Sequence, residues 1–163
     1  MDSALHMRNE ILSAKECSFQ AEITADYGDE VQSFTLNCKT DLQGNLTFSV
    51  VAPEIISGLT GKIDETGGGI NFDQSMLAFP LLADGQLSPV SAPWIFMHSL
   101  RSGFIHACGQ DKDLYRVTIH DSFSGAPLQM ELWFDNERKP VHCEIIWDGR
   151  RIITVNVSNF ITL

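Results

Sequence analysis

Two pairs of residues in the second half of the chain combine metal-binding side chains with a spacing of two. His106 lies two positions before Cys108, and His142 lies two positions before Glu144. Residues two apart in a strand point to the same face, so each pair could present two ligands to one ion. Zinc sites in proteins use at least about three protein ligands. Neither pair has a third ligand at a useful spacing, so we expect no metal site.

The sequence also lacks the common phosphate-binding and nucleophile motifs. The glycine run 67–69 has no Lys-Ser or Lys-Thr after it and follows Asp64-Glu65, whose charges would repel a phosphate, so it predicts a hairpin tip. No serine has the GxSxG surroundings of a nucleophile elbow, and Asp29-Glu30 lies in a predicted turn. We therefore predict no catalytic residue, no cofactor and no enzyme activity. A hydrolase or metalloenzyme ranks last among the functions that the sequence allows.

The four cysteines, Cys17, Cys38, Cys108 and Cys143, form no CxxC or CxH motif. Cys108 or Cys143 would need a positioned histidine to act as a nucleophile, and cysteines among apolar strand residues are usually inert. An even number of cysteines fits one or two disulfides as well as four buried thiols. Residue spacing leaves both states open.

The composition indicates one folded domain spanning residues 1–163. The chain is 44% hydrophobic and 20% charged, and its 11 Lys and Arg against 21 Asp and Glu give a formal net charge of −10. This acid excess, without a basic cluster, argues against nucleic acid and anionic lipid headgroups as partners. No apolar run reaches the ~20 residues of a membrane span, and the charged residues among the first fifteen do not fit a signal peptide.

Hydrophobic periodicity divides the chain into a helix, about six strands, a second helix and five strands. The first helix is predicted over residues 2–15, with Asp2 or Ser3 as its cap and with Leu5 and Leu12 widening its apolar stripe. The second helix, over residues 91–102, is apolar nearly all round and should be buried or cover a cavity. Strands are predicted over residues 18–26, 31–38, 46–50, 59–64, 69–79, 104–108, 114–120, 128–134, 141–147 and 151–160.

Short connections between these strands predict hairpins, so neighbouring strands should be antiparallel. The order of elements has no alternation of strand and helix that would give a parallel sheet. The predicted fold class is therefore α+β, mainly β. Its architecture is a strongly curved antiparallel sheet of about 11 strands, forming an open half-barrel with helices over the concave face.

Large apolar side chains fall on single faces of the predicted strands and on the second helix. A curved sheet with only two helices over it can leave an apolar cavity that binds an acyl chain or apolar peptide without catalytic groups. The same side chains can equally be the packed core of a β-domain. Trp133 is out of phase with its neighbours and should lie on the opposite face. The candidate cavity residues are Phe19, Ile23, Phe34, Leu36, Phe48, Val50, Trp94, Phe96, Met130, Leu132, Phe134, Ile145 and Trp147.

Three stretches of the chain look like a known family. They are the first helix running into CSFQAEITADYGD (17–29), the phrase FSVVAPEIISGLTG (48–61) and the closing strand VNVSNF (155–160). With these the chain resembles, over nearly its whole length, the LolA-like family of bacterial lipoproteins and lipoprotein carriers, in the form found as envelope lipoproteins of Gram-positive bacteria. The stretches shape the fold and carry no catalytic motif.

The resemblance implies an unclosed β-barrel with helices as a lid over an apolar cavity that holds lipid acyl chains. It further implies an extracytoplasmic, membrane-attached protein whose partner is a lipid, a lipidated protein or another envelope protein; we expect a monomer. No cysteine near Met1 fits lipid attachment, so an anchor must lie outside this chain. An oxidising location would favour disulfides. Cys17 and Cys38 flank the first predicted hairpin nearly opposite each other and are the first pair to test.

Two functional hypotheses follow from these expectations. The first is a non-enzymatic envelope protein that binds or carries an apolar ligand in the cavity of the half-barrel. The second is a structural or adaptor protein, for example in sporulation or envelope assembly, with a filled core and no ligand. The first hypothesis requires an open cavity between the sheet and the helices, whereas the second requires this space to be filled.

Overall fold

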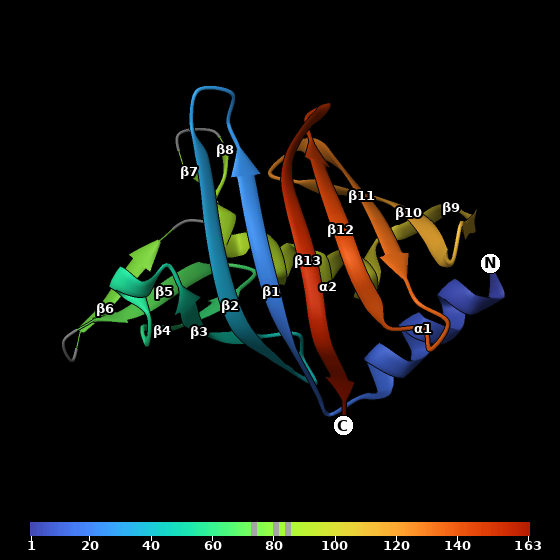
Figure 1. Cartoon of the computed structure of the whole chain (residues 1–163), viewed down its shortest axis with the longest axis horizontal. Helices are drawn as coiled ribbons and strands as arrows, with labels where there is room; N and C mark the ends of the chain where they lie inside the picture. Colours follow the sequence, from blue (N-terminus) through green and yellow to red (C-terminus); the bar gives the residue numbers. More distant parts are fainter. Residues whose placement is uncertain (73–74, 80–81, 84–85) are drawn as a thin grey trace.

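The computed structural model describes residues 1–72, 75–79, 82–83 and 86–163. In this part of the chain one antiparallel sheet of 11 strands dominates the molecule, and its two edges do not meet (Figure 1). Two helices lie on one side of the sheet, and a separate two-stranded ribbon lies near one end of it. The predicted open half-barrel is therefore confirmed.

The two helices are α1 (Asp2–Ser13) and α2 (Ala92–Ser102), and single 3-10 turns span Glu54–Ile56 and Pro89–Ser91. The large sheet contains β1 (Glu16–Asp26), β2 (Val31–Asp41), β3 (Leu46–Ala52), β4 (Thr60–Asp64), β5 (Gly67–Phe72), β6 (Ser75–Phe79), β9 (Phe104–Asp111), β10 (Leu114–Phe123), β11 (Ala126–Phe134), β12 (Pro140–Trp147) and β13 (Arg150–Thr162). The ribbon consists of β7 (Leu82–Ala83) and β8 (Gln86–Leu87).

The sheet is built from two meanders that meet at its centre. The strand order is β6-β5-β4-β3-β2-β1-β13-β12-β11-β10-β9, so hairpins link every neighbouring pair except β1 and β13. Ile23 of β1 pairs with Phe34 of β2 on one side and with Val155 of β13 on the other. The first and last strands of the chain thus join a β1–β6 half to a β9–β13 half.

Aspartate side chains close several of the predicted turns. In the β2–β3 turn the Asp41 carboxylate accepts hydrogen bonds from the backbone N–H groups of Gln43 and Asn45, each at 2.9 Å. Gly44 in the same turn has φ +88, a value that favours glycine. Asp135 accepts the same kind of bonds from Glu137 and Lys139 in the β11–β12 turn. These local contacts explain why turn residues predicted the hairpins correctly.

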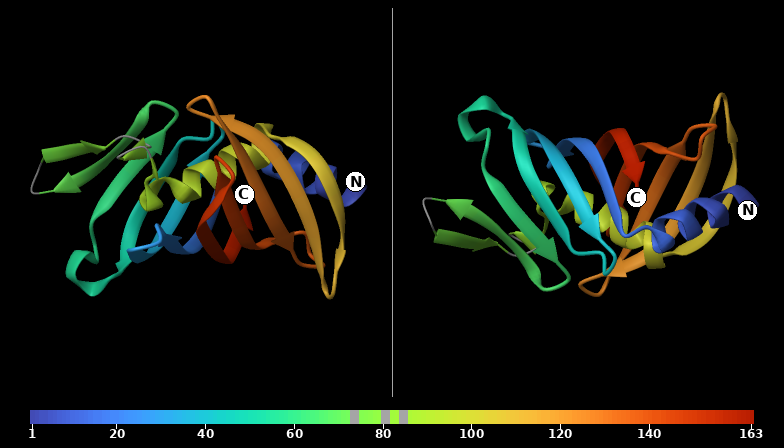
Figure 2. Two further views of the ribbon diagram at one scale, coloured as in Figure 1. Left: turned by 90° about the horizontal axis from the view of Figure 1, so that it is seen from above. Right: turned by 90° about the horizontal axis from the view of Figure 1, so that it is seen from below.

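Alternation of apolar and polar residues, clearest in β1, gives the sheet a buried face and a polar face. In β1, Phe19, Ala21 and Ile23 are buried and alternate with half-buried or exposed polar residues. We call the face that carries the buried residues the inner face and the other the outer face. Both helices lie against the inner face (Figure 2). The core of the protein is therefore the layer between the sheet and the helices.

Some predicted boundaries and caps were wrong. Residues 69–79 form parts of two strands, β5 and β6, because the chain reverses between Phe72 and Ser75; the intervening residues lie outside the described part. Asp2 lies inside α1 instead of capping it, and no side chain makes a capping bond there. Leu5 and Leu12 are exposed, so the buried stripe of α1 is narrow and contains only Ala4, Met7 and Ile11.

None of the described helices is both long enough and apolar enough to cross a membrane.

Candidate functional site

The predicted cavity residues come together on the inner face and on α2, and all but two of them are buried. Phe96 of α2 meets the ring of Phe19 edge-on at 5.7 Å between centroids, and Phe19 stacks on Phe160 of β13 at 5.6 Å. Phe34 and Trp147 are the half-buried members of the set. All of these residues except Phe34 belong to one continuous apolar cluster or pack against it, so the structure gathers them in one place.

Helix α2 occupies the concave side of the sheet (Figure 2). Its residues 92–97 and Ser99 and Leu100 are all buried, which leaves His98, Arg101 and Ser102 as its accessible positions. A helix buried around most of its circumference is surrounded by protein on all but one side. Here the side chains of α2 fill the space between helix and sheet in which the sequence predicted a possible ligand cavity.

Polar contacts fasten mainly the C-terminal end of α2. Arg8 of α1 donates to the carbonyl oxygens of Leu100 at 2.6 Å and Ser99 at 3.3 Å. Ser99 Oγ donates to Asp121 Oδ2 at 3.1 Å, and Arg101 donates to the carbonyl of Leu42 at 2.8 Å. The N-terminal turns of α2 are held mainly by apolar packing, for example the edge-on contact of Trp94 with Phe123. Hydrogen bonds to other elements therefore hold α2 mainly at its C-terminal end.

Partly exposed aromatic side chains lie near the other end of α2. Tyr27 follows β1, Phe123 ends β10 and Trp147 ends β12, so all three lie where the β1–β2, β10–β11 and β12–β13 turns gather (Figure 1). The Tyr27 hydroxyl donates to the carbonyl of Leu87 at 2.7 Å, and Trp147 Nε1 donates to the carbonyl of Phe123 at 3.2 Å. At this end, aromatic side chains at the border of the apolar layer are partly exposed.

The four cysteines are free in the structure. The register pairs Cys38 with Phe19 and Cys17 with Thr40, so Cys17 and Cys38 lie diagonally across the hairpin, not opposite each other as expected. Diagonal neighbours are ~7–8 Å apart at Cα, slightly beyond ordinary disulfide geometry. Their pairing under oxidising conditions stays a prediction. Burial raises the pKa of both Cys38 and Cys143, which makes these thiols poor nucleophiles.

The metal-binding side chains noted in the sequence make other contacts. His106 stacks on His120 with 4.2 Å between ring centroids, and His142 contacts Asn156 at 2.7 Å and Glu144 at 3.7 Å. Within residues 1–72, 75–79, 82–83 and 86–163, no three His, Cys, Asp or Glu side chains are grouped so as to hold a metal ion.

Charged residues on the outer face of the β9–β13 half are bonded to one another. Glu131 is buried and accepts hydrogen bonds from Arg116 at 2.8 Å, Thr118 at 2.9 Å and Gln129 at 2.7 Å. Burial alone would raise the pKa of Glu131, but these hydrogen bonds outweigh it and hold the pKa below its usual value. Trp133 lies on this face as predicted, with Nε1 donating to Asp111 at 2.7 Å.

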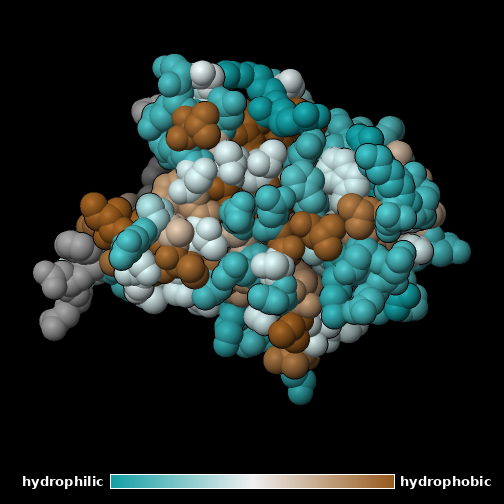
Figure 3. All heavy atoms as spheres, viewed as in Figure 1, coloured by the Kyte–Doolittle hydropathy of each residue, from teal (hydrophilic) through white to brown (hydrophobic). Residues whose placement is uncertain are grey.

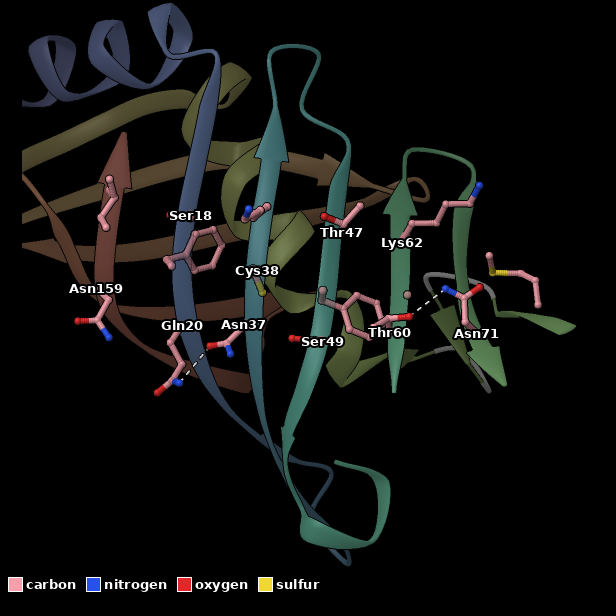
Figure 4. A pocket seen from close by; sticks show the side chains of 16 residues that line it. Ser18, Gln20, Asn37, Cys38, Thr47, Ser49, Thr60, Lys62, Asn71 and Asn159 are labelled. Atoms are coloured by element: carbon pink, nitrogen blue, oxygen red, sulfur yellow. Dashed lines mark hydrogen bonds between the residues drawn. The ribbon is translucent and has the colours of Figure 1, made fainter. Parts of the chain in front are cut away.

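An open groove on the outer face of the β1–β6 half was not predicted from the sequence. It encloses about 620 Å³ and crosses strands β1 to β5 (Figure 4). Amide and hydroxyl side chains line it, among them Gln20, Asn37, Ser49, Thr60 and Asn71. These residues are far apart in the sequence and become neighbours only through strand register, so no local pattern could have revealed the groove.

No protein-family model matches the chain, and no curated protein matches it in sequence. Solved structures do resemble it. A Vibrio parahaemolyticus domain named for outer-membrane lipoprotein sorting gives a TM-score of 0.53 at 8% identity, covering 99% of this chain and 91% of that one. A LolA superfamily protein from Nitrosomonas europaea gives 0.50 at 9% identity, with 99% and 93% covered. An uncharacterized conserved protein from Thermus thermophilus gives 0.52 at 11% identity, with 99% and 88% covered.

Proposed function

The chain has the LolA-like open half-barrel fold, and we propose that it works as a non-enzymatic binding domain for an acyl chain or another apolar group. The observation that carries this proposal is an apolar inner face covered by a helix that is itself apolar and buried around most of its circumference. The resemblance to structures named for LolA and lipoprotein sorting supports it. The ligand would bind between the sheet and α2, among the thirteen inner-face candidates.

Binding at this place requires α2 to move, because its side chains fill the concave face. Each methylene that leaves water contributes ~0.8 kcal/mol, so one long acyl chain could contribute ~8–10 kcal/mol before ordering costs. That amount is enough to displace part of a helix whose N-terminal turns are held mainly by packing. The aromatic residues Phe34 and Trp147, half-buried in the ligand-free state, would be the first to contact the entering chain.

We further propose that the protein acts in the cell envelope, outside the cytoplasm. A membrane anchor outside this chain and a lipid or lipidated protein as partner would fit the fold. The net charge of −10 would keep a protein with an apolar site in solution and would disfavour adhesion to an anionic membrane surface. A Gram-positive origin and membership of the LolA-like family are parts of the same proposal.

Native mass spectrometry and titration with a fluorescent fatty acid test the proposal. The Arg8→Ala variant should bind the fatty acid about 5- to 30-fold more tightly than the wild type, because losing the two bonds from Arg8 to α2 makes the open state easier to reach by ~1–2 kcal/mol. Lys112→Ala removes an exposed positive charge from the β9–β10 turn, outside the thirteen candidates, and should leave the affinity unchanged.

Hydrogen–deuterium exchange provides the signature of the mechanism. Bound fatty acid should speed exchange at the amides of residues 92–97 and slow exchange in β1 and β13, because α2 leaves the sheet and the ligand takes its place. Absence of a co-purified lipid, together with no fatty-acid binding by either the wild type or Arg8→Ala, would rule the proposal out.

A structural or adaptor protein is the second candidate, and the burial of most of α2 favours it. If the packed state is the functional one, the inner face serves only as a core and function lies in surface contacts. Exchange at α2 would then be slow and insensitive to fatty acid, and a partner protein would co-purify instead of a lipid.

A further inference from the structure

The groove on the outer face lies on the opposite side of the sheet from the proposed apolar site and has a different chemistry. Its polar side chains form a row that crosses five strands: Gln20 pairs with Asn37, Asn37 with Ser49, Ser49 with Thr60, and Thr60 with Asn71. At ~4.8 Å per strand the row is about 19 Å long. Every member is an amide or a hydroxyl, which can both donate and accept hydrogen bonds.

Few of these groups bond to one another. Gln20 donates to Asn37 Oδ1 at 3.1 Å, and Asn71 donates to Thr60 Oγ1 at 3.0 Å (Figure 4). Ser49, between these two pairs, makes no side-chain hydrogen bond with the described residues. The row therefore keeps donors and acceptors free toward the groove.

Two lysines run beside the row. Lys39 and Lys62 both pair with Thr47 of β3, so they lie on either side of one strand, with about 10 Å between their backbones. None of the described residues that line the groove is Asp or Glu, although 21 of the 163 residues of the chain are acidic. Lys39 has Glu16 at 3.7 Å, at the edge of the groove. Asp64 lies near Lys62 on β4. The lining of the groove itself thus contains two lysines and no carboxylate, with acidic residues just outside it.

Met76 and Gly69 shape the wall of the groove at β5 and β6. A Cβ at Gly69 would run into the Met76 sulfur, so the absence of a side chain at Gly69 lets Met76 fold over β5. Ile161 of β13 lines the opposite end of the groove, beyond Ser18. Phe19, Cys38 and Phe48 also line the groove, so its row of polar side chains is flanked by apolar groups. On the face of the molecule in Figure 3, hydrophilic residues predominate and hydrophobic residues are scattered among them.

We propose that this groove binds an acidic glycan, meaning an oligosaccharide strand that carries carboxylate or phosphate groups. The row of amides and hydroxyls matches the hydroxyl groups of successive sugars, and the two lysines match anionic groups on the strand. Its length suits an oligosaccharide better than a single sugar.

Other occupants fit less well. An extended peptide binds at a sheet edge through free backbone groups, but β1 to β5 are interior strands whose backbone groups pair with their neighbours. An acyl chain cannot form hydrogen bonds with a row of amides. Nucleic acid would need more than two lysines on a protein of net charge −10. Hydrogen-bonding capacity and charge together favour the acidic glycan.

Titration with three soluble probes tests the proposal: a short oligogalacturonate, neutral dextran oligomers of similar length, and poly-glutamate. NMR signals of the side-chain amides of Asn37 and Asn71 report occupancy of the groove. We expect oligogalacturonate to shift these signals, dextran to bind at least tenfold more weakly, and poly-glutamate to leave them unshifted. Equal binding of dextran would overturn the role of the lysines, equal binding of poly-glutamate would overturn the role of the sugar, and no binding of oligogalacturonate would overturn the whole proposal.

A matched pair of variants separates the groove from general charge effects. Lys39→Gln/Lys62→Gln should weaken oligogalacturonate binding about tenfold, as the loss of two exposed charge contacts would. Lys15→Gln/Lys112→Gln makes the same change in net charge at exposed lysines outside the groove and should leave binding unchanged. Equal effects in both variants would contradict the proposal. Fatty-acid binding on the inner face should be the same in all of these variants, so the two proposals fail separately.

Discussion

The outer faces of the two halves of the sheet are both polar, but their side chains are used differently. On the β9–β13 half, Arg116, Thr118 and Gln129 all donate to the buried carboxylate of Glu131. On the β1–β6 half, the row from Gln20 to Asn71 contains only two internal hydrogen bonds and faces an open groove. Polar groups that bond to one another stabilise a fold, whereas polar groups left free toward a groove can bind something else.

The strength of the Glu131 cluster follows from its burial. Glu131 is 4% exposed, and a carboxylate removed from water needs several hydrogen bonds to remain charged. Arg116 keeps about half of its surface in water, which limits the desolvation cost on its side of the ion pair. Substitutions on the two outer faces should therefore differ in their effect on stability.

Glu131→Ala should produce the largest effect. It leaves Arg116, Thr118 and Gln129 without their shared acceptor, and we expect the free energy of unfolding to fall by about 1–3 kcal/mol. Urea unfolding followed by circular dichroism measures this. Glu65→Ala, at an exposed position in the β4–β5 turn, serves as the control and should change stability by less than about 0.5 kcal/mol. A loss no larger than that of the control would show that the Glu131 cluster is not stabilising.

The stabilisation from Glu131 should depend on pH in a defined direction. Because its pKa is lower in the folded than in the unfolded protein, the contribution is fully present above the ordinary value of 4.5 and is lost as pH falls through the folded pKa. The stability difference between the wild type and Glu131→Gln should therefore be constant at neutral pH and shrink below pH 4.5. Urea midpoints measured across this range test it; a difference that grows on acidification would contradict the assigned shift.

Alternating residues were enough to predict which face of each strand is buried. Phe19, Ile23 and Leu36 were assigned to the inner face from period-two patterns, and the same patterns placed Trp133 on the outer face. Short connections predicted the hairpins, and residues such as Asp41 and Gly44 form these turns through contacts that are local in sequence. Interactions between residues close in sequence therefore determine the hairpins and which face of each strand is buried.

The features that were not predicted depend on pairing between residues far apart in the sequence. The contact of β1 with β13 joins residues such as Ile23 and Val155, and no turn connects them. The row from Gln20 to Asn71 likewise depends on the register of four hairpins, since a shift of one residue in any strand would turn its polar side chain to the inner face. The place of α2 over the concave face was predicted, but the packing of its side chains into this space was not, because it depends on contacts with residues far away in the sequence.

Trp133→Phe should have a smaller effect than Glu131→Ala. It removes the hydrogen bond from Trp133 Nε1 to Asp111 and weakens the contact with the Arg116 guanidinium, whose carbon lies 5.3 Å from the ring centroid. We expect a loss of about 1 kcal/mol, because the indole is half-buried and both partners remain accessible to water. Thermal unfolding should show a midpoint lower by about 2–4 °C. A change as large as that of Glu131→Ala would mean that the two residues belong to one cooperative cluster.

Substitutions in the groove should have the smallest effect on stability. Asn37→Ala and Thr60→Val each remove one partner of an exposed hydrogen bond, so each should change the free energy of unfolding by less than about 0.5 kcal/mol. Urea unfolding beside Glu131→Ala measures the contrast directly. A loss above about 1 kcal/mol at either position would mean that the row is needed for the fold, as the Glu131 cluster is. A negligible loss, combined with weaker binding of oligogalacturonate, would show instead that these side chains contribute to binding while the hairpin register alone holds them in line.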